Sequence, residues 1–233
     1  MASSVHADDG DESPSRRHDF DSGWLVTGGL YGGYLRRPPG ITSFSTPSGF
    51  RFSALEGRDI SPDHGVGLIG LDLRLGFSTR TPIFFNLFGV RVAYPIGSPY
   101  HVDVTDDDGK AGRIRLHNSL YGEILFPGIG LRFATANVRF GLAITPALAV
   151  YATTGTVTQG ALTADVDANG VGLNLDGDAF FCGRIARTDP EATWICGYAA
   201  PLLYTSTPET FFNGIIVGIR IDASAKSIPW FGR

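Results

Sequence analysis

Large apolar residues alternate with small or polar ones along the stretch from Asn137 to Tyr151. Phe140, Leu142 and Ile144 fall on one parity, whereas Arg139 falls on the other among glycine, alanine and threonine. Successive side chains of a β-strand point to opposite faces, so the pattern predicts a strand with one continuous apolar face. The other face is small as well as polar, which suits a narrow, crowded interior better than contact with bulk water.

Six further segments repeat this two-faced pattern. In the segment 66–77, leucine and isoleucine alternate with Asp72, Arg74 and glycine. The chain has 31 Gly, 16 Phe, 8 Tyr and 3 Trp, a composition that favours tightly packed β-structure. No window reaches the ~18 unbroken apolar residues of a transmembrane helix. The seven predicted strands are 24–34, 66–77, 83–94, 120–133, 137–151, 194–204 and 211–221.

Parity assigns each side chain of these segments to a face. In the segment 83–94 we place Phe84 on the apolar face. In the segment 120–133 we place Tyr121 and Leu125 on the apolar face. Glu123 shares their parity, which requires a β-bulge or a rim position at that point.

Charged residues recur on the small face of the predicted strands. In an eight-stranded barrel the lumen is only wide enough for side chains to fill, so these residues predict a plugged core. A small anion-selective pore is the alternative. The arginines outnumber the acids that we place inside, so we expect part of the lumen to hold water. The predicted lumen charge network is Asp72, Arg74, Arg91, Arg132, Arg139 and Arg220.

Long connections after residues 34, 94 and 151 alternate with short ones at 78–81, 134–136 and 205–209. Short turns on one side and long loops on the other are the plan of outer-membrane barrels. We expect one hairpin from 41–45 and 50–54, and another from 100–104 and 113–116 around an Asp-Gly turn that extends above the membrane.

On this architecture the chain resembles small bacterial outer-membrane β-barrel proteins of the eight-stranded, OmpA/OmpX-like kind. The resemblance implies an all-β, antiparallel up-and-down transmembrane β-barrel over residues 23–233. The polar and charged composition of residues 1–19 predicts that the segment 1–22 before it is disordered. The eighth strand is either the tail 227–233 or a strand hidden in the segment 152–193. The sequence Val5-His6-Ala7 resembles the end of a secretory signal, so we expect a signal upstream; an ordinary disordered tail is the alternative.

The resemblance implies a bacterial outer-membrane location and a lipid bilayer as the main partner. Lipopolysaccharide or an extracellular ligand is a further partner expected at the long loops, which carry a structural or surface-interaction role. Net charge is −4 with no basic cluster, so nucleic acid is not expected as a partner. A soluble lipocalin-like barrel is the alternative. In a membrane barrel the charged residues point inward, whereas in a soluble barrel they point to water.

The segment Asp165-x-Asp167-x-Asn169-Gly170, with Asp176 at the twelfth position, matches the ligand spacing of an EF-hand calcium loop. Asp replaces the usual bidentate Glu, and no helical pattern flanks the segment. A simple Asn-Gly hairpin turn is the favoured reading, with calcium as the only candidate cofactor.

His117 and Ser119 resemble the His-x-Ser pair of outer-membrane lipid A deacylases, in which a serine nucleophile lies beside a histidine base. A triad also needs an acid on the histidine. Glu123 lies six residues away along the strand, roughly 20 Å, which is out of reach. A polar rim pair is therefore favoured, and we do not expect an enzyme.

Cys182 and Cys196 are the two cysteines of the chain. They close a loop of modest size, and a disulfide between them suits an oxidising compartment. Two free buried thiols in a cytoplasmic protein are the alternative.

Overall fold

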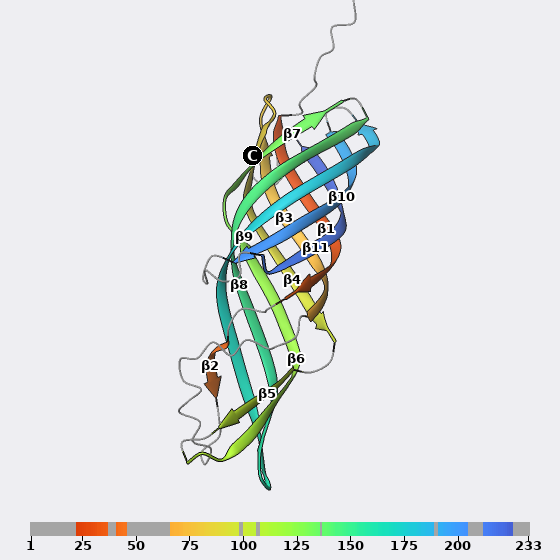
Figure 1. Ribbon diagram of the computed structural model, residues 1–233. Coiled ribbons are helices and arrows are strands. Elements are labelled where there is room, and N and C mark those ends of the chain that lie inside the picture. The colour runs from red at the N-terminus through yellow and green to blue at the C-terminus, as the bar shows by residue number, and fades with distance from the viewer. Residues whose placement is uncertain are drawn as a thin grey trace, which may run out of the picture.

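The computed structural model describes residues 22–36, 41–45, 66–97, 100–105, 108–135, 137–188, 191–204 and 212–225. The elements in these ranges are all β-strands (Figure 1). Within these ranges no helix is long and apolar enough to cross a membrane. The strands are β1 (Gly23–Leu35), β2 (Ile41–Ser45), β3 (Val66–Ser78), β4 (Ile83–Ile96), β5 (Tyr100–Thr105), β6 (Ala111–Leu125), β7 (Gly128–Ala134), β8 (Val138–Gln159), β9 (Leu162–Thr188), β10 (Glu191–Tyr204) and β11 (Gly214–Ala225).

Eight strand crossings close into one antiparallel ring. Its order is β1, β3, β4, β6 with β7, β8, β9, β10, β11 and back to β1. β6 and β7 form a single crossing, because both pair with β4 on one side and β8 on the other. This arrangement is compatible with a β-barrel. The eighth strand is β9, within the segment 152–193, so that one of the two expected positions is confirmed; the other, 227–233, lies outside the described residues.

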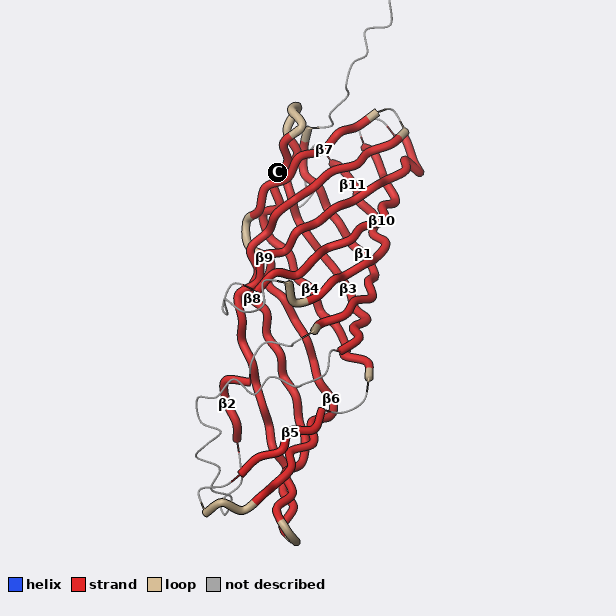
Figure 2. The backbone as a smooth tube through the Cα atoms, viewed as in Figure 1, coloured by secondary structure: helices blue, strands red, loops and turns tan. Residues whose placement is uncertain are grey.

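Residues paired directly across neighbouring strands form rows around the ring, and each row shifts along the strands as it passes around. A row that leaves β8 at Arg139 returns to β8 at Ala149, a stagger of ten residues. Staggered pairing requires tilted strands, as Figure 2 shows, and it leaves an interior that side chains fill. The row therefore brings residues distant in sequence to one level. Its other members are Cys182, Cys196, Arg220, Gly29, Asp72, Arg91 and Glu123.

Large apolar side chains cover the outside of the ring, as the alternation predicts. We call these side chains the outer belt. They lie on every crossing, and the representatives named here are each 44–66% exposed. They are Leu30 on β1, Leu71 on β3, Val92 on β4, Ile129 on β7, Leu142 on β8, Phe181 on β9, Ile195 on β10 and Ile219 on β11.

A bulge in β4 reverses the predicted position of Phe84. The pairing with β3 shifts between Leu75 and Gly76, so that Leu87 and Phe88 both face outward. Residues before the bulge therefore exchange faces, and Phe84 points inward with only 3% of its surface exposed. Placing Phe84 on the apolar outer face was wrong, because strict parity takes no account of the extra residue.

A break between β6 and β7 corrects the assignment of Tyr121 and Leu125, which are both buried inside the ring beside Glu123. The break falls at Phe126 and Pro127, where Phe126 donates its amide hydrogen to the carbonyl of Pro146 at 2.8 Å. Parity restarts after the break, so the residues on its two sides need separate assignments. The irregularity that Glu123 required is present.

Beyond the ring, β6, β8 and β9 continue into an open sheet, which we call the extension: residues 41–45, 100–105, 111–117, 152–159 and 162–169. Its order is β2, β9, β8, β6, β5, and it projects from one end of the ring (Figure 1). The turn that joins β8 to β9 uses Gly160 at a φ of 59°.

The two hairpins expected from the sequence both involve strands of the extension, and their outcomes differ. The hairpin of β5 and β6 is confirmed, and the turn before β6 has Gly109 at a φ of 78°. The strand predicted at 41–45 is β2, but it pairs with β9; its expected partner, 50–54, lies outside the described residues. The added strand β9 also changes the side on which the connection around 205–209 lies. This connection joins the end of β10 to the start of β11, and both of these ends lie on the extension side of the ring. Its assignment to the short-turn side was therefore wrong.

Candidate functional site

Charged side chains fill the interior of the ring. Among the described residues, the buried charged side chains are five arginines and five carboxylates. Buried charges are costly unless they are paired and hydrogen-bonded, so the equal numbers matter to stability. The arginines are Arg74, Arg91, Arg132, Arg139 and Arg220, and the carboxylates are Asp72, Glu123, Asp176, Asp178 and Asp222.

Arg91 on β4 lies at the centre of the charges nearer the extension, and it is completely buried. Its Nε lies 3.1 Å from Asp72 Oδ2 and its Nη1 lies 3.0 Å from Glu123 Oε2. Its Nη2 lies 2.7 Å from Asp176 Oδ2. One guanidinium therefore links β4 to β3, β6 and β9 across the interior.

Arg74 on β3 connects Arg91's carboxylates to a second group of charges. Its Nη2 and Nε donate to the carboxylate of Asp72 at 2.7 and 2.9 Å, and its Nη1 donates to Asp178 at 2.8 Å. Arg220 Nη1 donates to the same Asp178 oxygen at 2.5 Å, and Arg220 Nε lies 3.3 Å from Asp222 Oδ1. The ion pairs are therefore continuous from β3 through β9 to β11.

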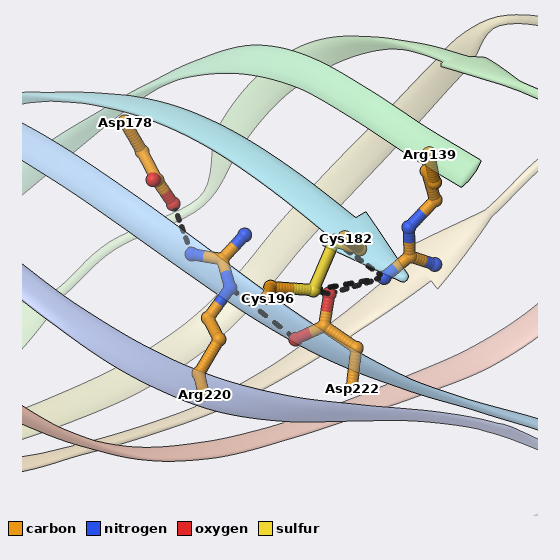
Figure 3. Close-up of a disulfide and its surroundings, with 6 residues drawn as sticks. All are labelled: Arg139, Asp178, Cys182, Cys196, Arg220 and Asp222. Carbon is orange, nitrogen blue, oxygen red and sulfur yellow. Dashed lines mark hydrogen bonds and ion pairs between the residues drawn. A yellow bond between two sulfur atoms is a disulfide. The ribbon is translucent and has the colours of Figure 1, made fainter. Parts of the chain in front are cut away.

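The disulfide between Cys182 and Cys196 lies in the same interior, next to the second group of charges (Figure 3). Arg139 forms a short ion pair with Asp222, and its Nη2 lies 3.8 Å from each sulfur atom. The guanidinium also lies over the ring of Trp194, 5.0 Å from its centroid. The expected disulfide is thus present, and it is enclosed by charged and aromatic groups.

Neutral polar groups complete the charge network at the Glu123 end. The hydroxyl of Tyr121 donates to Glu123 Oε1 at 2.6 Å, and the amide of Asn174 donates to the same oxygen at 2.5 Å. The hydroxyl of Tyr198 lies 3.3 Å from Asp72 Oδ2. Both carboxylates thus accept bonds from neutral groups in addition to their arginine partners.

The six residues of the predicted lumen network all lie inside the ring. Arg132 is nearer the short-turn end, where its Nη2 donates to the carbonyl of Thr79 at 3.1 Å. Among the described residues arginine is not in excess, because four interior carboxylates were not placed from the sequence. They are Glu123, Asp176, Asp178 and Asp222.

Little free volume remains inside the ring around Arg132. A cavity of about 10 Å³ lies between Thr27, Phe84, Arg132, Arg220 and Asp222. That volume is about the minimum that a single water molecule needs. The described side chains therefore plug the ring at this level.

His117 lies on β6 where the ring meets the extension. Its carbonyl accepts bonds from the hydroxyls of Thr153 and Thr154 at 3.2 and 3.3 Å. The pairing with β8 shifts between His117 and Ser119, and the side chain of Ser119 lies outside what the structure describes. Glu123 points into the interior towards Arg91, so it is not the acid of a His117 triad.

The four residues of the candidate calcium loop lie along one continuous strand, β9. Asp165, Asp167 and Asn169 are exposed on the extension, whereas Asp176 is buried in the ring beside Arg91. Eleven residues of strand span about 36 Å. The structure therefore does not bring these oxygens together around one point.

The outward face of β8 changes from apolar to polar where the strand leaves the ring. Phe140, Leu142, Ile144 and Val150 face outward within the ring. Thr154 and Thr158 face outward on the extension, and there the inward side chain is Val157, which is fully buried. A single strand thus shows an apolar exterior in the ring and an ordinary buried apolar face beyond it.

β9 and β6 change at the same level as β8. On β9 the exposed Val171 is followed towards the turn by Asn169 and Asp167, and Val166 is buried. The register places Val150 opposite Val171 and Ala152 opposite Asn169. On β6 the exposed Leu120 gives way to exposed Arg115 and Arg113, with Ile114 and Leu116 buried. The three strands therefore define one boundary around this side of the molecule.

An exposed ion pair lies on the extension between β5 and β6. Arg113 Nε donates to Asp103 Oδ1 at 2.8 Å. This hydrogen bond and the positive charge of Arg113 lower the pKa of the Asp103 carboxyl below its ordinary value. Both side chains are largely exposed to solvent, so water and salt screen their attraction.

Comparison of the chain with protein-family models and with curated protein sequences gives no match. The functional argument therefore depends on the ring, its interior and the extension alone.

Proposed function

We propose that this chain is an outer-membrane β-barrel with a sealed interior and a surface-interaction role carried by the extension. The ring is the membrane-spanning part, and its outer belt contacts lipid. The extension projects from the membrane into water, where its polar face and strand edges meet partners. Lipopolysaccharide or another extracellular ligand is the partner class that this position favours.

The change of polarity at one level on β6, β8 and β9 carries this proposal. A soluble lipocalin-like barrel has apolar residues inside and polar residues outside along the full length of each strand. Here that order holds on the extension and is inverted in the ring. A boundary between water and lipid gives a direct reason for the inversion, because exposed side chains match their solvent on each side.

The height of the outer belt supports a single crossing of a bilayer. On β3 the exposed apolar side chains run from Ile69 to Phe77. These nine residues match the ~9–11 that a tilted strand needs to span the hydrocarbon core. β1 begins and β11 ends side by side, at the end of the ring away from the extension (Figure 1).

The sealed interior favours a structural or binding role over transport. Arg91 and Arg74 each contact carboxylates from more than one strand, so charged side chains pair with one another across the interior. In this proposal the barrel anchors and orients the extension. The charged residues inside the barrel stabilise its fold.

Insertion into lipid vesicles tests the proposal. Urea-unfolded chain is diluted into vesicles, which are floated on a density gradient and analysed by gel electrophoresis with and without boiling. We expect the chain to float with lipid and to migrate faster before boiling, because a closed barrel resists the detergent. A chain that instead folds as a monomer in buffer without lipid or detergent would support the lipocalin-like alternative.

A further inference from the structure

The two sulfur atoms of the disulfide lie inside the wall of the ring. Cys182 on β9 pairs directly with Cys196 on β10, and both residues are 0% exposed. The two strands follow one another in the chain, and the cysteines are separated by fourteen positions. Local pairing of β9 with β10 is therefore sufficient to bring the cysteines together.

Side chains from the two flanking strands enclose the sulfur atoms. Arg139 comes from β8 and Asp222 from β11, on opposite sides of the β9–β10 pair. Arg139 Nη2 lies 3.8 Å from each sulfur, and Asp222 Oδ2 lies 3.4 Å from Cys196 Sγ. The ion pair between Arg139 and Asp222 thus covers the disulfide only when β8 and β11 are in place (Figure 3).

An oxidant has no room to reach the cysteines once the ring is closed. Thiol–disulfide exchange requires a thiolate to attack a sulfur of the oxidant through a mixed disulfide. Both cysteines are 0% exposed, and Arg139 and Asp222 lie directly against their sulfur atoms. A cavity beside these two side chains measures about 10 Å³, room for about one water molecule. A closed ring therefore excludes even a small disulfide-bearing molecule.

We propose that the Cys182–Cys196 disulfide is formed by a disulfide-bearing oxidant before the ring closes, on the paired or unfolded β9–β10 segment. One cysteine thiolate attacks the oxidant disulfide, which forms a mixed disulfide and releases one oxidant thiolate. The other cysteine thiolate then attacks the sulfur of the first cysteine and releases the second. The two cysteines lose two protons and two electrons, and the oxidant becomes a dithiol.

This order means that oxidation of the two cysteines precedes assembly of the ring. A thiol–disulfide oxidoreductase acts on the chain before closure, and the closed ring then shields the product from reductants. The inference depends on the burial of the sulfurs, so it holds whether or not the ring lies in a membrane. Failure of vesicle insertion and failure of this order are therefore separate results.

Oxidation rates in the unfolded and folded full chain test the order. Reduced chain is treated with oxidised glutathione either in urea or after folding into detergent micelles, where folding is checked by migration of the unboiled sample. Free thiols are then counted by maleimide–polyethylene glycol labelling after denaturation. We expect the folded chain to oxidise at least about 100-fold more slowly, because exchange waits for the ring to open.

A cross-strand pair on the extension, of an exposed and a half-buried residue, provides the control. Arg115 and Thr156 pair directly between β6 and β8 on the extension. The variant Arg115→Cys/Thr156→Cys, with Cys182→Ala and Cys196→Ala, is expected to oxidise at similar rates folded and unfolded. If the reduced natural chain does not fold, the reverse reaction replaces the test: dithiothreitol should reduce the folded, oxidised chain at least about 100-fold more slowly than the unfolded one. Equal rates for the natural pair in the two states would overturn the proposal.

Discussion

Arg91 shows at the scale of one residue how the interior is held together. Its guanidinium contacts Asp72, Glu123 and Asp176, which come from three other strands. A buried ion pair contributes little compared with well-packed apolar side chains, but removal of one partner leaves uncompensated buried charge. The network therefore makes the interior sensitive to the loss of any single arginine.

We expect Arg91→Ala to lower the free energy of unfolding by about 3–5 kcal/mol, because three carboxylates lose a buried partner. Urea-induced unfolding in lipid vesicles, followed by tryptophan fluorescence, measures the change. Arg113→Ala is the matched control, because Arg113 is exposed and pairs with Asp103 in solvent. Equal effects of the two substitutions would contradict the account of the interior.

The Asp103–Arg113 pair gives a prediction of pH dependence outside the ring. Arg113 lowers the pKa of Asp103, so the pair stabilises the β5–β6 hairpin when the pH is above the ordinary aspartate value. That contribution is lost as the pH falls through the lowered pKa. Carboxyl ¹³C NMR titration should show the lowered pKa and its return towards the ordinary value in Arg113→Gln. An unchanged pKa in that variant would exclude the pair as its cause.

At the scale of the element, β8 shows two environments along one strand. Ile144 faces outward near the middle of its apolar stretch, and Thr154 faces outward on the extension. Both positions are exposed, and in the proposed function Ile144 faces lipid whereas Thr154 faces water. Their tolerance to charge should therefore differ.

Ile144→Arg is expected to destabilise the folded chain by about 2–4 kcal/mol in vesicles, the cost of arginine near the middle of a bilayer. Thr154→Arg is its control on the same strand and is expected to leave the folded fraction unchanged. Urea titration with gel migration of unboiled samples reports both. If Ile144→Arg is tolerated as well as Thr154→Arg, the outer belt does not face lipid.

Strand alternation predicted most of the ring because each regular strand repeats its two faces every second residue. It failed where a local irregularity changes the parity. The bulge beside Leu87 exchanges the face of Phe84, and the break at Phe126 and Pro127 changes the faces of Tyr121 and Leu125. Glu123 falling among apolar residues was the one local sign of such an irregularity.

The interior carboxylates were missed for related reasons. Asp176 and Asp178 lie on β9, whose glycine-rich and acidic sequence is typical of a loop. Asp222 lies one residue beyond the predicted end of the last strand. On β9, residues 171–185 alternate with apolar side chains outward, as in the other strands of the ring. Residues 163–169 instead carry polar side chains outward, so no single pattern covers the strand. The sequence therefore predicted the arginines of the network more completely than their partners.

At the scale of the whole molecule, the interior network and the extension separate two roles. The network fills the interior of the ring, and in the proposed function the extension provides the surface for interaction. We therefore expect the chain to show no stable conductance in planar bilayers, because buried charged side chains fill the interior and pair across it. Discrete, reproducible channel openings from chain whose insertion is verified would favour the small anion pore.

The boundary between lipid and water is the central claim, and accessibility along β8 measures it most directly. Single cysteines at outward positions from Phe140 to Thr158, with Cys182→Ala and Cys196→Ala, are spin-labelled in vesicles and exposed to oxygen or to a nickel chelate. Oxygen, which concentrates in lipid, should relax the labels as far as Val150, and the chelate should relax those from Thr154 onward. Labels that all respond to the chelate, at Leu142 as at Thr158, would contradict a membrane-spanning ring.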